Sequence, residues 1–392
     1  MYPDLSYFFF KTFGTQPDNA LSIVKTFGLL LVLAILSAAA IMIKELKRKE
    51  AQGLLEPTIE EHVVGKPASI GEMIGNAIVG FLLFFKIAYI AVNFEAFKFD
   101  PAAIVFSAKG NWILGILGAA LFGYLKYREK QQTVLPSPEV RKVKVYPHER
   151  MADITMLAAI SGVIGAKVFA LIEGIGKLSW EQIMAQFFSG AGLAIYGGLL
   201  VGFACVFGYL MWKKINPIHV MDAFAPAYMV SYAVGRMGCQ LSGDGDWGIP
   251  VDQLSWTQPG WMPDWFWGQT YPNNVADMGE KIAGCAHRYC YQLPAPVFPT
   301  PIWEIAASLL IAGFLWSIRK KITVPGMLFF IFLIFNGIER WFVEYIRIND
   351  TYEFMGGQYS QAQFIAAGLI TAGIIGTVFL WFKRRNQRMA ST

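Results

Sequence analysis

Stretches of about 20 mostly apolar residues alternate with short polar segments along almost the whole chain. Because a helix needs about 20 such residues to cross the hydrocarbon core of a bilayer, each stretch predicts a membrane-spanning helix. The sixth stretch is the most polar, since it contains His219, Asp222, Pro226 and Arg236, and we expect a half-buried or broken helix there. The nine predicted spans are residues 20–43, 71–94, 102–125, 152–173, 189–212, 218–241, 301–318, 325–346 and 361–382.

The basic residues orient these spans. Of the 33 Lys and Arg residues, 21 fall on one side of a nine-span arrangement, in the segments that follow the odd-numbered spans. Such an excess of positive charge marks the cytoplasmic side, so we expect the N-terminus outside and the C-terminus in the cytoplasm. The segment 242–300, rich in Trp, Pro and Gly, then forms a small irregular extracytoplasmic head. The basic positions are 44–50, Lys66, 126–150, 213–214, 319–321 and 383–388.

Composition excludes several classes of protein. Hydrophobic residues make up 55% of the chain and charged residues only 16%, which excludes a water-soluble or disordered protein. No basic tract with interleaved aromatic residues is present, so we expect no nucleic acid partner. The internal repeats of many transporters are also missing. Four Cys residues make no disulfide framework, but we expect Cys285 and Cys290 in the head to form a local disulfide.

Charged residues inside predicted spans are costly and therefore indicate function. Arg340, Glu344 and Arg347 have i, i+4, i+7 spacing, which predicts that all three lie on one face of a helix. Together with Arg236 they give two or three guanidinium groups and fewer carboxylates near the outer end, a combination that indicates a phosphate or other anion site. An interhelical ion-pair network remains the alternative. The charges inside spans are Lys25, Lys86, Lys167, Arg236, Glu304, Glu339, Arg340, Glu344 and Arg347.

Three local patterns have both a structural and a functional interpretation. Tyr196, Gly197 and Gly198 indicate either close helix packing or the approach of a lipid headgroup to Tyr196. The Asp-Gly-Asp sequence at 244–246 resembles part of a metal loop, but two carboxylates without an EF-hand frame are weak evidence, and we expect no metal. Cys239 has no neighbouring His, so a small buried residue is favoured over a nucleophile.

Seven segments, in order along the chain, carry a family resemblance. They are IVKTFGLLLVLAILSAAA (23–40), ISGVIGAKVFALIE (160–173), SGAGLAIYGGLLVG (189–202), DAFAPAYMVSYAVGRMGCQLSGDGDWG (222–248), PTPIWE (299–304), NGIERWFVEYIR (336–347) and GGQYS (356–360). Together these segments resemble the bacterial prolipoprotein diacylglyceryl transferases, over about residues 20–45 and 150–385.

The resemblance implies an all-α integral membrane protein in which a seven-span core carries a two-span insertion, because residues 51–150 have no counterpart in the family pattern. An even number of inserted spans preserves the orientation of everything that follows. The expected parts are an N-terminal interfacial segment and first span (1–50), the inserted loop and two spans (51–150), core spans (151–241), the head (242–300) and C-terminal core spans (301–392).

The family transfers a diacylglyceryl group from phosphatidylglycerol to the lipobox cysteine of a preprolipoprotein and releases glycerol phosphate. The expected partners are therefore phosphatidylglycerol, the preprolipoprotein signal peptide and membrane lipids, in the bacterial inner membrane, and no cofactor is implied. An inactive lipid-binding relative and an anion or lipid transporter remain as alternatives. The resemblance implies catalytic roles for Arg236, Arg340 and Tyr196, and substrate binding by Arg236, Arg340, Glu344, Arg347, Gly197, Gly198, Lys167, Cys239 and Gly248.

Departures from the family pattern concern the polar positions. Tyr196 stands where several members have the His proposed to act in catalysis, and Cys239 replaces Asn. Lys167 replaces Arg, and one residue is inserted around Asp244. The two Arg positions and Glu344 are kept, so the resemblance supports an anion site better than it supports any named general base.

Overall fold

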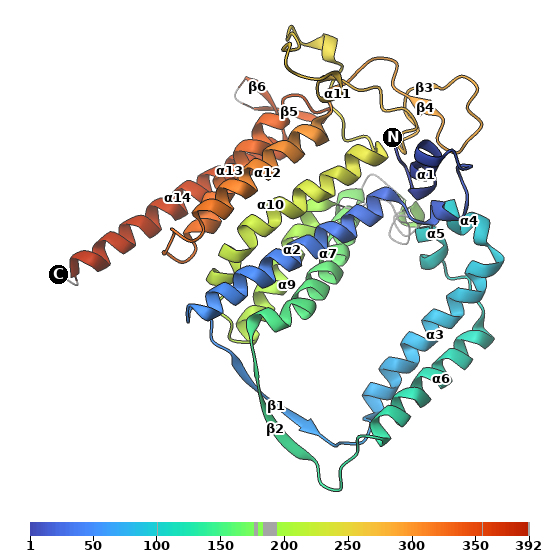
Figure 1. The fold of residues 1–392 in the computed structure, drawn as a ribbon, viewed down its shortest axis with the longest axis vertical. Helices are drawn as coiled ribbons and strands as arrows, with labels where there is room; N and C mark the ends of the chain where they lie inside the picture. Colours follow the sequence, from blue (N-terminus) through green and yellow to red (C-terminus); the bar gives the residue numbers. More distant parts are fainter. Residues whose placement is uncertain (100, 176–178, 183–193, 355, 391–392) are drawn as a thin grey trace. The chain divides into compact units, whose positions relative to one another are not determined.

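The computed structural model describes residues 1–99, 101–175, 179–182, 194–354 and 356–390. The chain divides into two compact units. Unit 1 comprises Met1–Leu55 and Asn216–Thr392, and unit 2 comprises Glu56–Ile215. Each unit is mostly helical, and the described residues also form three separate two-stranded sheets (Figure 1).

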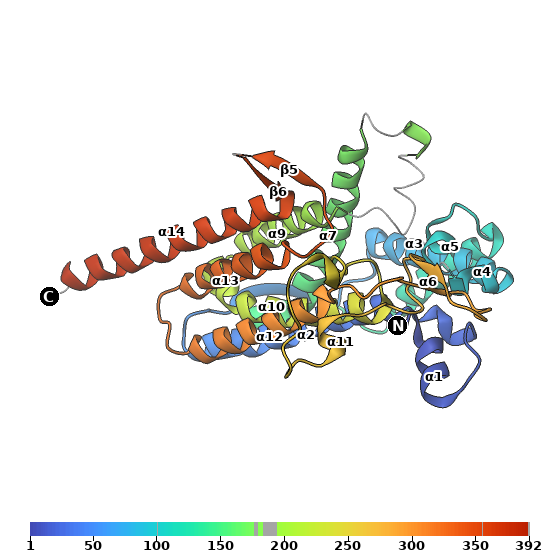
Figure 2. The ribbon, with the colours of Figure 1, turned by 90° about the horizontal axis from the view of Figure 1, so that it is seen from above.

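Unit 1 is built from five long helices. They are α2 (Thr26–Ala51), α10 (Pro217–Ser242), α12 (Thr300–Ile318), α13 (Met327–Val343) and α14 (Gln361–Ala390). Helix α10 packs against α2, α12 and α13, and α13 also packs against α14 (Figures 1 and 2). The core between α10, α12 and α13 contains Met229, Leu315 and Phe332, which are at most 4% exposed. Helix α10 is thus the central helix of this unit.

The remaining elements of unit 1 are short. The N-terminal helix α1 (Leu5–Phe13) and the turn η1 (Ala20–Ile23) precede α2. The segment between α10 and α12 holds η3 (Val251–Gln253), α11 (Asp264–Trp267) and the paired strands β3 (Glu280–Lys281) and β4 (Tyr291–Gln292). The expected disulfide between Cys285 and Cys290 is formed there. The hairpin of β5 (Thr351–Phe354) and β6 (Gly357–Ser360) joins α13 to α14.

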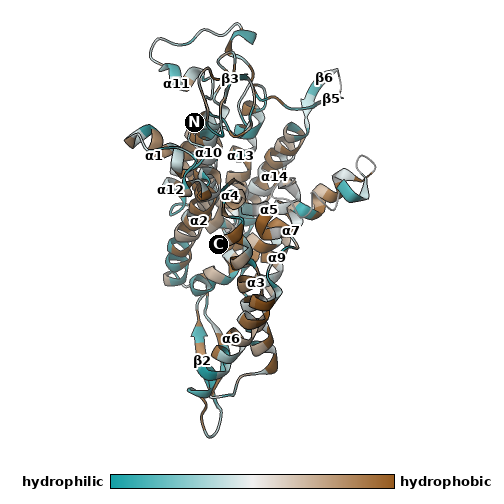
Figure 3. Cartoon of the chain, turned by 90° about the vertical axis from the view of Figure 1, so that its right-hand side faces the viewer, coloured by the Kyte–Doolittle hydropathy of each residue, from teal (hydrophilic) through white to brown (hydrophobic). Residues whose placement is uncertain are grey.

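Unit 2 holds two helix pairs and one sheet. Helix α3 (Ile70–Val92) packs against α6 (Trp112–Gln131), and α7 (Met151–Gly174) packs against α9 (Ile195–Trp212). Strands β1 (Thr58–Val64) and β2 (Glu139–Val145) pair antiparallel, from Thr58 opposite Val145 to Val64 opposite Glu139. Shorter helices are α4 (Phe94–Phe99), α5 (Pro101–Phe106) and η2 (Pro147–Arg150). Hydropathy separates these parts, since the helices are largely apolar and β2 is polar (Figure 3).

Five of the described helices are long and apolar enough to cross a bilayer, which is consistent with an all-α membrane protein. They correspond to the first, second, fourth, seventh and ninth predicted spans. A predicted start or end is wrong for two of these, since the first helix begins at Thr26 rather than at residue 20 and the second ends at Val92 rather than at residue 94. A shorter apolar helix, Gly197–Trp212, corresponds to the fifth predicted span, of which residues 189–193 lie outside the described residues. The five helices are Thr26–Ala51, Ile70–Val92, Pro147–Ile172, Thr300–Ile318 and Gln361–Gln387.

The other three predicted spans differ from the helices in instructive ways. The span predicted at 102–125 is wrong in its start, because α5 ends at Phe106 and Asn111 caps a new helix by accepting a hydrogen bond from the backbone N–H of Leu114 at 3.0 Å. The sixth span is the continuous helix α10 despite Pro226, so it is half-buried and the broken alternative is wrong. Its polar residues are tolerated because neighbouring helices surround it. The eighth span ends three residues early, at Val343.

Candidate functional site

Three arginines from separate parts of unit 1 converge where α10 ends and α12 begins. Arg236 lies one and a half turns before the end of α10, Arg340 lies in the last turn of α13, and Arg347 follows α13. Their side chains are only 13%, 21% and 10% exposed. A guanidinium group this far removed from water requires anionic partners.

Glu304, in the first turns of α12, is the common partner of all three arginines and is fully buried. Its Oε1 lies 3.3 Å from Arg340 and 3.5 Å from Arg347, and its Oε2 lies 3.0 Å from Nε of Arg236. The hydroxyl of Tyr232 donates to Oε1 at 2.9 Å and accepts from Nε of Arg236 at 3.1 Å. Tyr232 and Arg236 are i, i+4 neighbours on α10, so this helix presents both to the carboxylate.

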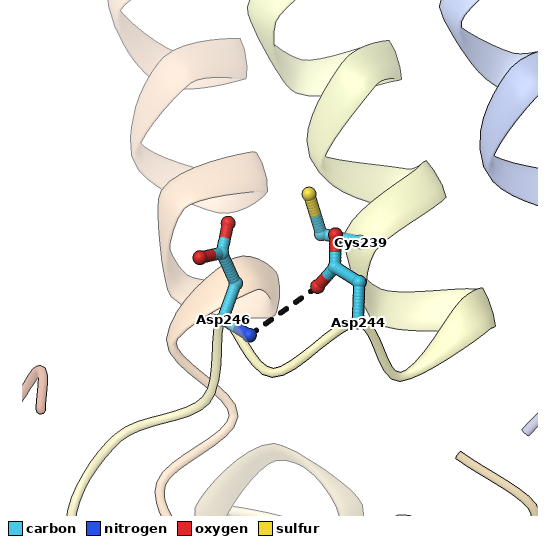
Figure 4. Close-up of side chains that lie close together, drawn as sticks. All are labelled: Cys239, Asp244 and Asp246. Carbon is cyan, nitrogen blue, oxygen red and sulfur yellow. Dashed lines mark hydrogen bonds between the residues drawn. The ribbon is translucent and has the colours of Figure 1, made fainter. Parts of the chain in front are cut away.

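Asp246 binds two of the arginines from the loop that follows α10. One carboxylate oxygen pairs with Arg236, and the other lies 2.5 Å from Arg347. Burial acts to raise the pKa of Asp246, but the guanidinium groups of Arg236 and Arg347 outweigh it and lower that pKa. Asp244 is hydrogen-bonded to the backbone N–H of Asp246, and its own pKa is raised by burial and by the charge of Asp246 (Figure 4).

Glu344 completes the group by pairing with Arg340 at 3.1 Å. It also accepts a hydrogen bond from the side chain of Asn349. Because α13 ends at Val343, Arg347 is not on the helical face of Arg340 and Glu344, so the prediction of a single face is wrong for Arg347. Arg347 reaches the same site through the turn that follows the helix.

We call these six residues the arginine–carboxylate network: Arg236, Asp246, Glu304, Arg340, Glu344 and Arg347. It contains three guanidinium groups and three carboxylates, so the expectation of fewer carboxylates than arginines is wrong. The reason is that Asp246 and Glu304 come from a loop and a helix far from Arg340 in sequence. Each guanidinium nonetheless has five N–H donors in a planar fork, so donors remain for a bound phosphate.

A pair of extended segments positions the loop of Asp246 against Arg347. The backbone N–H of Gly248 donates to Phe298 at 2.8 Å, and that of Ile249 donates to Ile346 at 2.9 Å. A Cβ atom on Gly248 would lie 2.5 Å from the carbonyl oxygen of Ile346, so only glycine permits this approach. Gly248, predicted as a substrate-binding residue, therefore has a structural reason for its identity.

Cys239 lies one turn after Arg236, which approaches its Sγ at 3.7 Å, and is 7% exposed. Ligand atoms of Cys239, Asp244 and Asp246 lie within 4.8 Å of one another, the one such group of potential metal ligands among the described residues (Figure 4). Since the carboxylate of Asp246 already pairs with two guanidinium groups, a cation would compete with both. We assign no metal to this group.

The remaining predicted site residues belong to unit 2. A Cβ on Gly197 would lie 2.2 Å from that of Phe169, and a Cβ on Gly198 would lie 2.8 Å from the carbonyl oxygen of Gly162. These glycines therefore allow α7 and α9 to pack closely, which supports the packing interpretation. Lys167 is partly exposed on α7. The backbone of Tyr196 lies in the first turn of α9, and its side chain lies outside the described part of the chain.

Two other lysines in predicted spans stabilise local structure. The ammonium group of Lys86 donates to the carbonyl oxygens of Ile104, at 3.1 Å, and Lys109, at 3.0 Å, and so satisfies groups around the end of α5. Lys25 precedes α2 and pairs with Asp4 at 3.4 Å.

Sequence reasoning missed the role of three side chains in this site. Tyr232 was overlooked, although its position four residues before Arg236 on a predicted helix is a usable signal. Asp246 was considered only as a metal ligand. Glu304 was noted as a charge inside a span, but nothing in the sequence identifies it as the common partner of three arginines.

Comparison with known proteins gives a family match and several similar sequences. The sequence profile of the prolipoprotein diacylglyceryl transferases matches residues 112–379, more than half of the chain. Phosphatidylglycerol–prolipoprotein diacylglyceryl transferases of Streptococcus pyogenes serotypes M5, M49 and M1 are each 27% identical over 304 residues. Each alignment covers 76% of this chain and 97% of the relative.

Proposed function

The chain belongs to the prolipoprotein diacylglyceryl transferase family, and we propose that it transfers the diacylglyceryl group of phosphatidylglycerol to the lipobox cysteine of preprolipoproteins. The reaction forms a thioether and releases glycerol phosphate, so the protein is a transferase that acts in lipoprotein biosynthesis. Both substrates reside in the bilayer, and a membrane-embedded site avoids extracting either of them.

The observation that carries this proposal is the convergence of Arg236, Arg340 and Arg347 at the end of α10. The leaving group is a phosphate ester, whose negative charge increases as the carbon–oxygen bond breaks. Pre-oriented guanidinium donors in a water-poor site stabilise such charge without reorganising, and removing one donor of this kind typically costs about 100- to 1000-fold in rate. Glu304, Glu344 and Asp246 hold the three side chains in place before substrate binds.

The nucleophile is supplied by the second substrate. A free cysteine thiol has a pKa near 8.5, and positive potential from the arginines raises its thiolate fraction. This is one reason why the family's His need not be essential and why Tyr196 is compatible with activity. From the family resemblance we propose that Tyr196 hydrogen-bonds the phosphate or relays a proton, and that Lys167 and Cys239 line the substrate path. Gly197 and Gly198 have the structural role of allowing α7 and α9 to pack closely.

We further propose a location and orientation. The protein lies in the bacterial inner membrane, with its N-terminus outside and its C-terminus in the cytoplasm, as the distribution of Lys and Arg predicts. The segment 242–300 is then an extracytoplasmic head. We propose that residues 51–150 are an insertion in a seven-span core, and residues 51–111 of this insertion precede the family match. The Cys285–Cys290 disulfide supports exposure of the head to an oxidising compartment.

A direct transfer assay tests the function. The purified full-length chain is reconstituted with phosphatidylglycerol and a peptide that carries a signal sequence with a lipobox cysteine, and the products are identified by mass spectrometry. We expect the diacylglyceryl thioether and glycerol phosphate in equal amounts. A peptide with Ser in place of the cysteine, and vesicles of phosphatidylethanolamine alone, are the controls and should give no product. Failure to form thioether from the complete mixture would refute the proposal.

A further inference from the structure

A fourth acidic side chain, Glu339, is buried beside the arginine–carboxylate network and takes part in none of its ion pairs. It is 6% exposed, and its Oε1 has no hydrogen-bond partner among the described residues. No salt bridge to Glu339 occurs in the part of the chain that the structure describes. This is unusual, because buried carboxyl groups are normally paired or hydrogen-bonded.

Glu339 nevertheless faces the network rather than lipid. It lies two turns after Phe332 on α13, and the ring of Phe332 packs against Phe224 and Tyr228 of α10, so this face of α13 is turned toward α10. Tyr228 stacks in turn on Tyr232, whose hydroxyl donates to Glu304. The charged groups on the elements packed against this face are Arg236 on α10, Glu304 on α12, and Arg340 and Arg347 on α13 and in the turn after it. The carboxyl group is therefore placed among the groups that we assign to phosphate binding.

Charge balance indicates the ionisation state of this carboxyl group. The three guanidinium groups are already matched by Asp246, Glu304 and Glu344, each of which pairs with at least one of them. An ionised Glu339 would add an uncompensated negative charge to a buried site, which costs several kcal/mol. It would also repel a phosphate. A protonated Glu339 leaves the site neutral before substrate binds.

Resting on the proposed function, we propose that Glu339 is the proton donor to the leaving phosphate. The cysteine sulfur forms a bond to the glyceryl carbon, and the bond from that carbon to the phosphate oxygen breaks with its electron pair on the oxygen. Glu339 gives its proton to the phosphate, so that glycerol phosphate leaves as a monoanion. The proton lost by the thiol returns to the carboxylate of Glu339. The net change is the transfer of one proton from thiol to phosphate, with no oxidant or reductant.

The need for this proton transfer follows from the charge balance of the arginine–carboxylate network. Cleavage converts a phosphodiester with one negative charge into a monoester that would carry a second one. Arginines that already have carboxylate partners cannot compensate the additional charge fully. A proton delivered from an adjacent neutral carboxyl group does so, and general acid catalysis of this kind typically contributes about 100- to 10,000-fold.

The test compares Glu339→Gln, which keeps the size of the side chain but cannot release a proton, with Glu339→Asp, which keeps the acid. Full-length protein in phosphatidylglycerol vesicles is assayed with the lipobox peptide from weakly acidic to alkaline pH. We expect Glu339→Gln to lower kcat by about 100-fold or more, with KM changed by less than about twofold. The wild-type rate should fall on the alkaline side, where Glu339 loses its proton. That decline should disappear in Glu339→Gln and return in Glu339→Asp.

A matched control is Glu45→Gln, since Glu45 is also a buried carboxylate of unit 1, 2% exposed, but lies at the other end of the unit. It should lower the thermal midpoint and leave kcat per folded molecule unchanged. An unchanged rate and pH profile in Glu339→Gln would overturn the proposal, as would equal losses in the Gln and Asp variants with the alkaline decline intact. If Glu339→Gln is not recovered folded, a shift of the alkaline decline in Glu339→Asp supports the proposal and an unshifted decline overturns it. Absence of thioether with the wild type overturns the proposed function itself.

Discussion

Helix α10 carries a buried ionic network at each of its ends, and the two are used differently. At its C-terminal end, Arg236 belongs to the arginine–carboxylate network. At its N-terminal end, Asp222 pairs with Lys49 at 3.5 Å and accepts hydrogen bonds from the backbone N–H groups of Gly326, at 2.9 Å, and Phe329, at 3.1 Å. Gly326 is the N-cap of α13 and has no side chain, so Asp222 caps that helix from a neighbouring one.

We call the group at the N-terminal end of α10 the Asp222 network; it comprises Glu45, Arg48, Lys49, Asp222 and Arg319. Both oxygens of Glu45 are used, one by Arg319 at 2.7 Å and the other by Arg48 at 2.8 Å. The guanidinium of Arg319 also stacks on Trp316 at 3.4 Å. Every carboxylate oxygen of this network thus has a hydrogen-bond partner, and these partners connect α2 to the end of α12 and α10 to the start of α13.

The arginine–carboxylate network lacks this completeness. Oε2 of Glu304 and Oε2 of Glu344 are buried without a hydrogen bond to any described residue, although both lie near guanidinium groups. Glu339, which is not a member of the network, likewise has a buried Oε1 with no such partner. Two networks of similar composition therefore differ in one respect: in the Asp222 network every carboxylate oxygen accepts a hydrogen bond, so its hydrogen bonds are exhausted, whereas in the arginine–carboxylate network some carboxylate oxygens accept none from the described residues. We infer that the exhausted network stabilises the fold, whereas the incomplete one is arranged for a ligand.

The largest expected effect is that of Arg340→Ala. Because Arg340 is the most exposed guanidinium of its network and is oriented by both Glu304 and Glu344, we expect transfer to fall at least about 1000-fold while membrane insertion is retained. Turnover per folded molecule is measured with the thioether assay. The matched variant Arg319→Ala should lower the thermal midpoint and keep turnover. Near-wild-type transfer by Arg340→Ala would remove the basis for the anion site.

We expect Asp222→Ala to have the opposite effect to Arg340→Ala, because it should lower stability and leave turnover unchanged. Lys49 and the first N–H groups of α13 would lose their partner, and breaking a buried ion pair costs about 3 kcal/mol. We expect a lower midpoint of thermal unfolding in detergent and unchanged turnover per folded molecule. Asp222→Asn keeps a backbone acceptor and should lose less stability. If the Ala variant folded normally but turned over slowly, the distinction between the two networks would be wrong.

The substitution Arg236→Lys changes the shape of the side chain while keeping its positive charge. The guanidinium of Arg236 contacts both Asp246 and Glu304, and an ammonium group cannot make both contacts and a bidentate phosphate contact. We expect about a 100-fold loss of turnover, or about 2.7 kcal/mol of barrier. Arg319→Lys is the matched control and should retain turnover. Normal turnover by Arg236→Lys would mean that Arg236 supplies only a positive charge.

The sequence predicts where the helices lie better than it predicts their exact ends or which helices pack together. Runs of apolar residues locate the long helices that the structure describes, because burial in lipid requires long apolar segments. The boundaries at 112 and 343 were not predicted, since a capping side chain such as Asn111 or the turn after Val343 decides them. The central position of α10 was not predicted either, because it depends on the helices that pack around it. Its polar residues indicated only that it differs from an ordinary lipid-facing span.

For the site, spacing along one helix was informative and contacts between helices were not. The shared face of Arg340 and Glu344 was predicted correctly, because i, i+4 neighbours meet on any helix, and the two side chains pair in the structure. Glu304 lies 36 residues from Arg340, and nothing local predicts that they meet. The number of carboxylates at the site was predicted wrongly for the same reason, since contacts between distant residues cannot be read from local spacing. Only the packing of α10, α12 and α13 brings Asp246 and Glu304 to the arginines.

A third ionic group lies in unit 2, outside the predicted spans. It extends the comparison of the two networks of unit 1, and the effect expected there is the smallest. Oε1 of Glu60 on β1 lies 2.7 Å from Lys213, after α9, and 2.8 Å from Arg150, in η2. Hydrogen bonds from Lys213 and then Arg150 lower the pKa of Glu60 from 4.5 to about 2. By the argument above, this carboxylate ties β1 to the neighbouring helices and has no chemical role.

We therefore expect Glu60→Gln to leave turnover unchanged and to destabilise β1 and β2 by about 1 kcal/mol, since solvent screens much of the interaction. Because the pKa is lowered in the folded chain, the stabilisation is present above pH 4.5 and is lost as the pH falls towards about 2. Hydrogen exchange at the amides of β1 measures the effect at neutral pH and again within this acidic window, where wild type and variant should converge. Glu61→Gln is the matched control, because Glu61 pairs with Lys142 at 3.5 Å on an exposed face and should contribute little. Equal effects of the two substitutions would show that the number of hydrogen bonds to a carboxylate does not distinguish a structural ion pair in this protein.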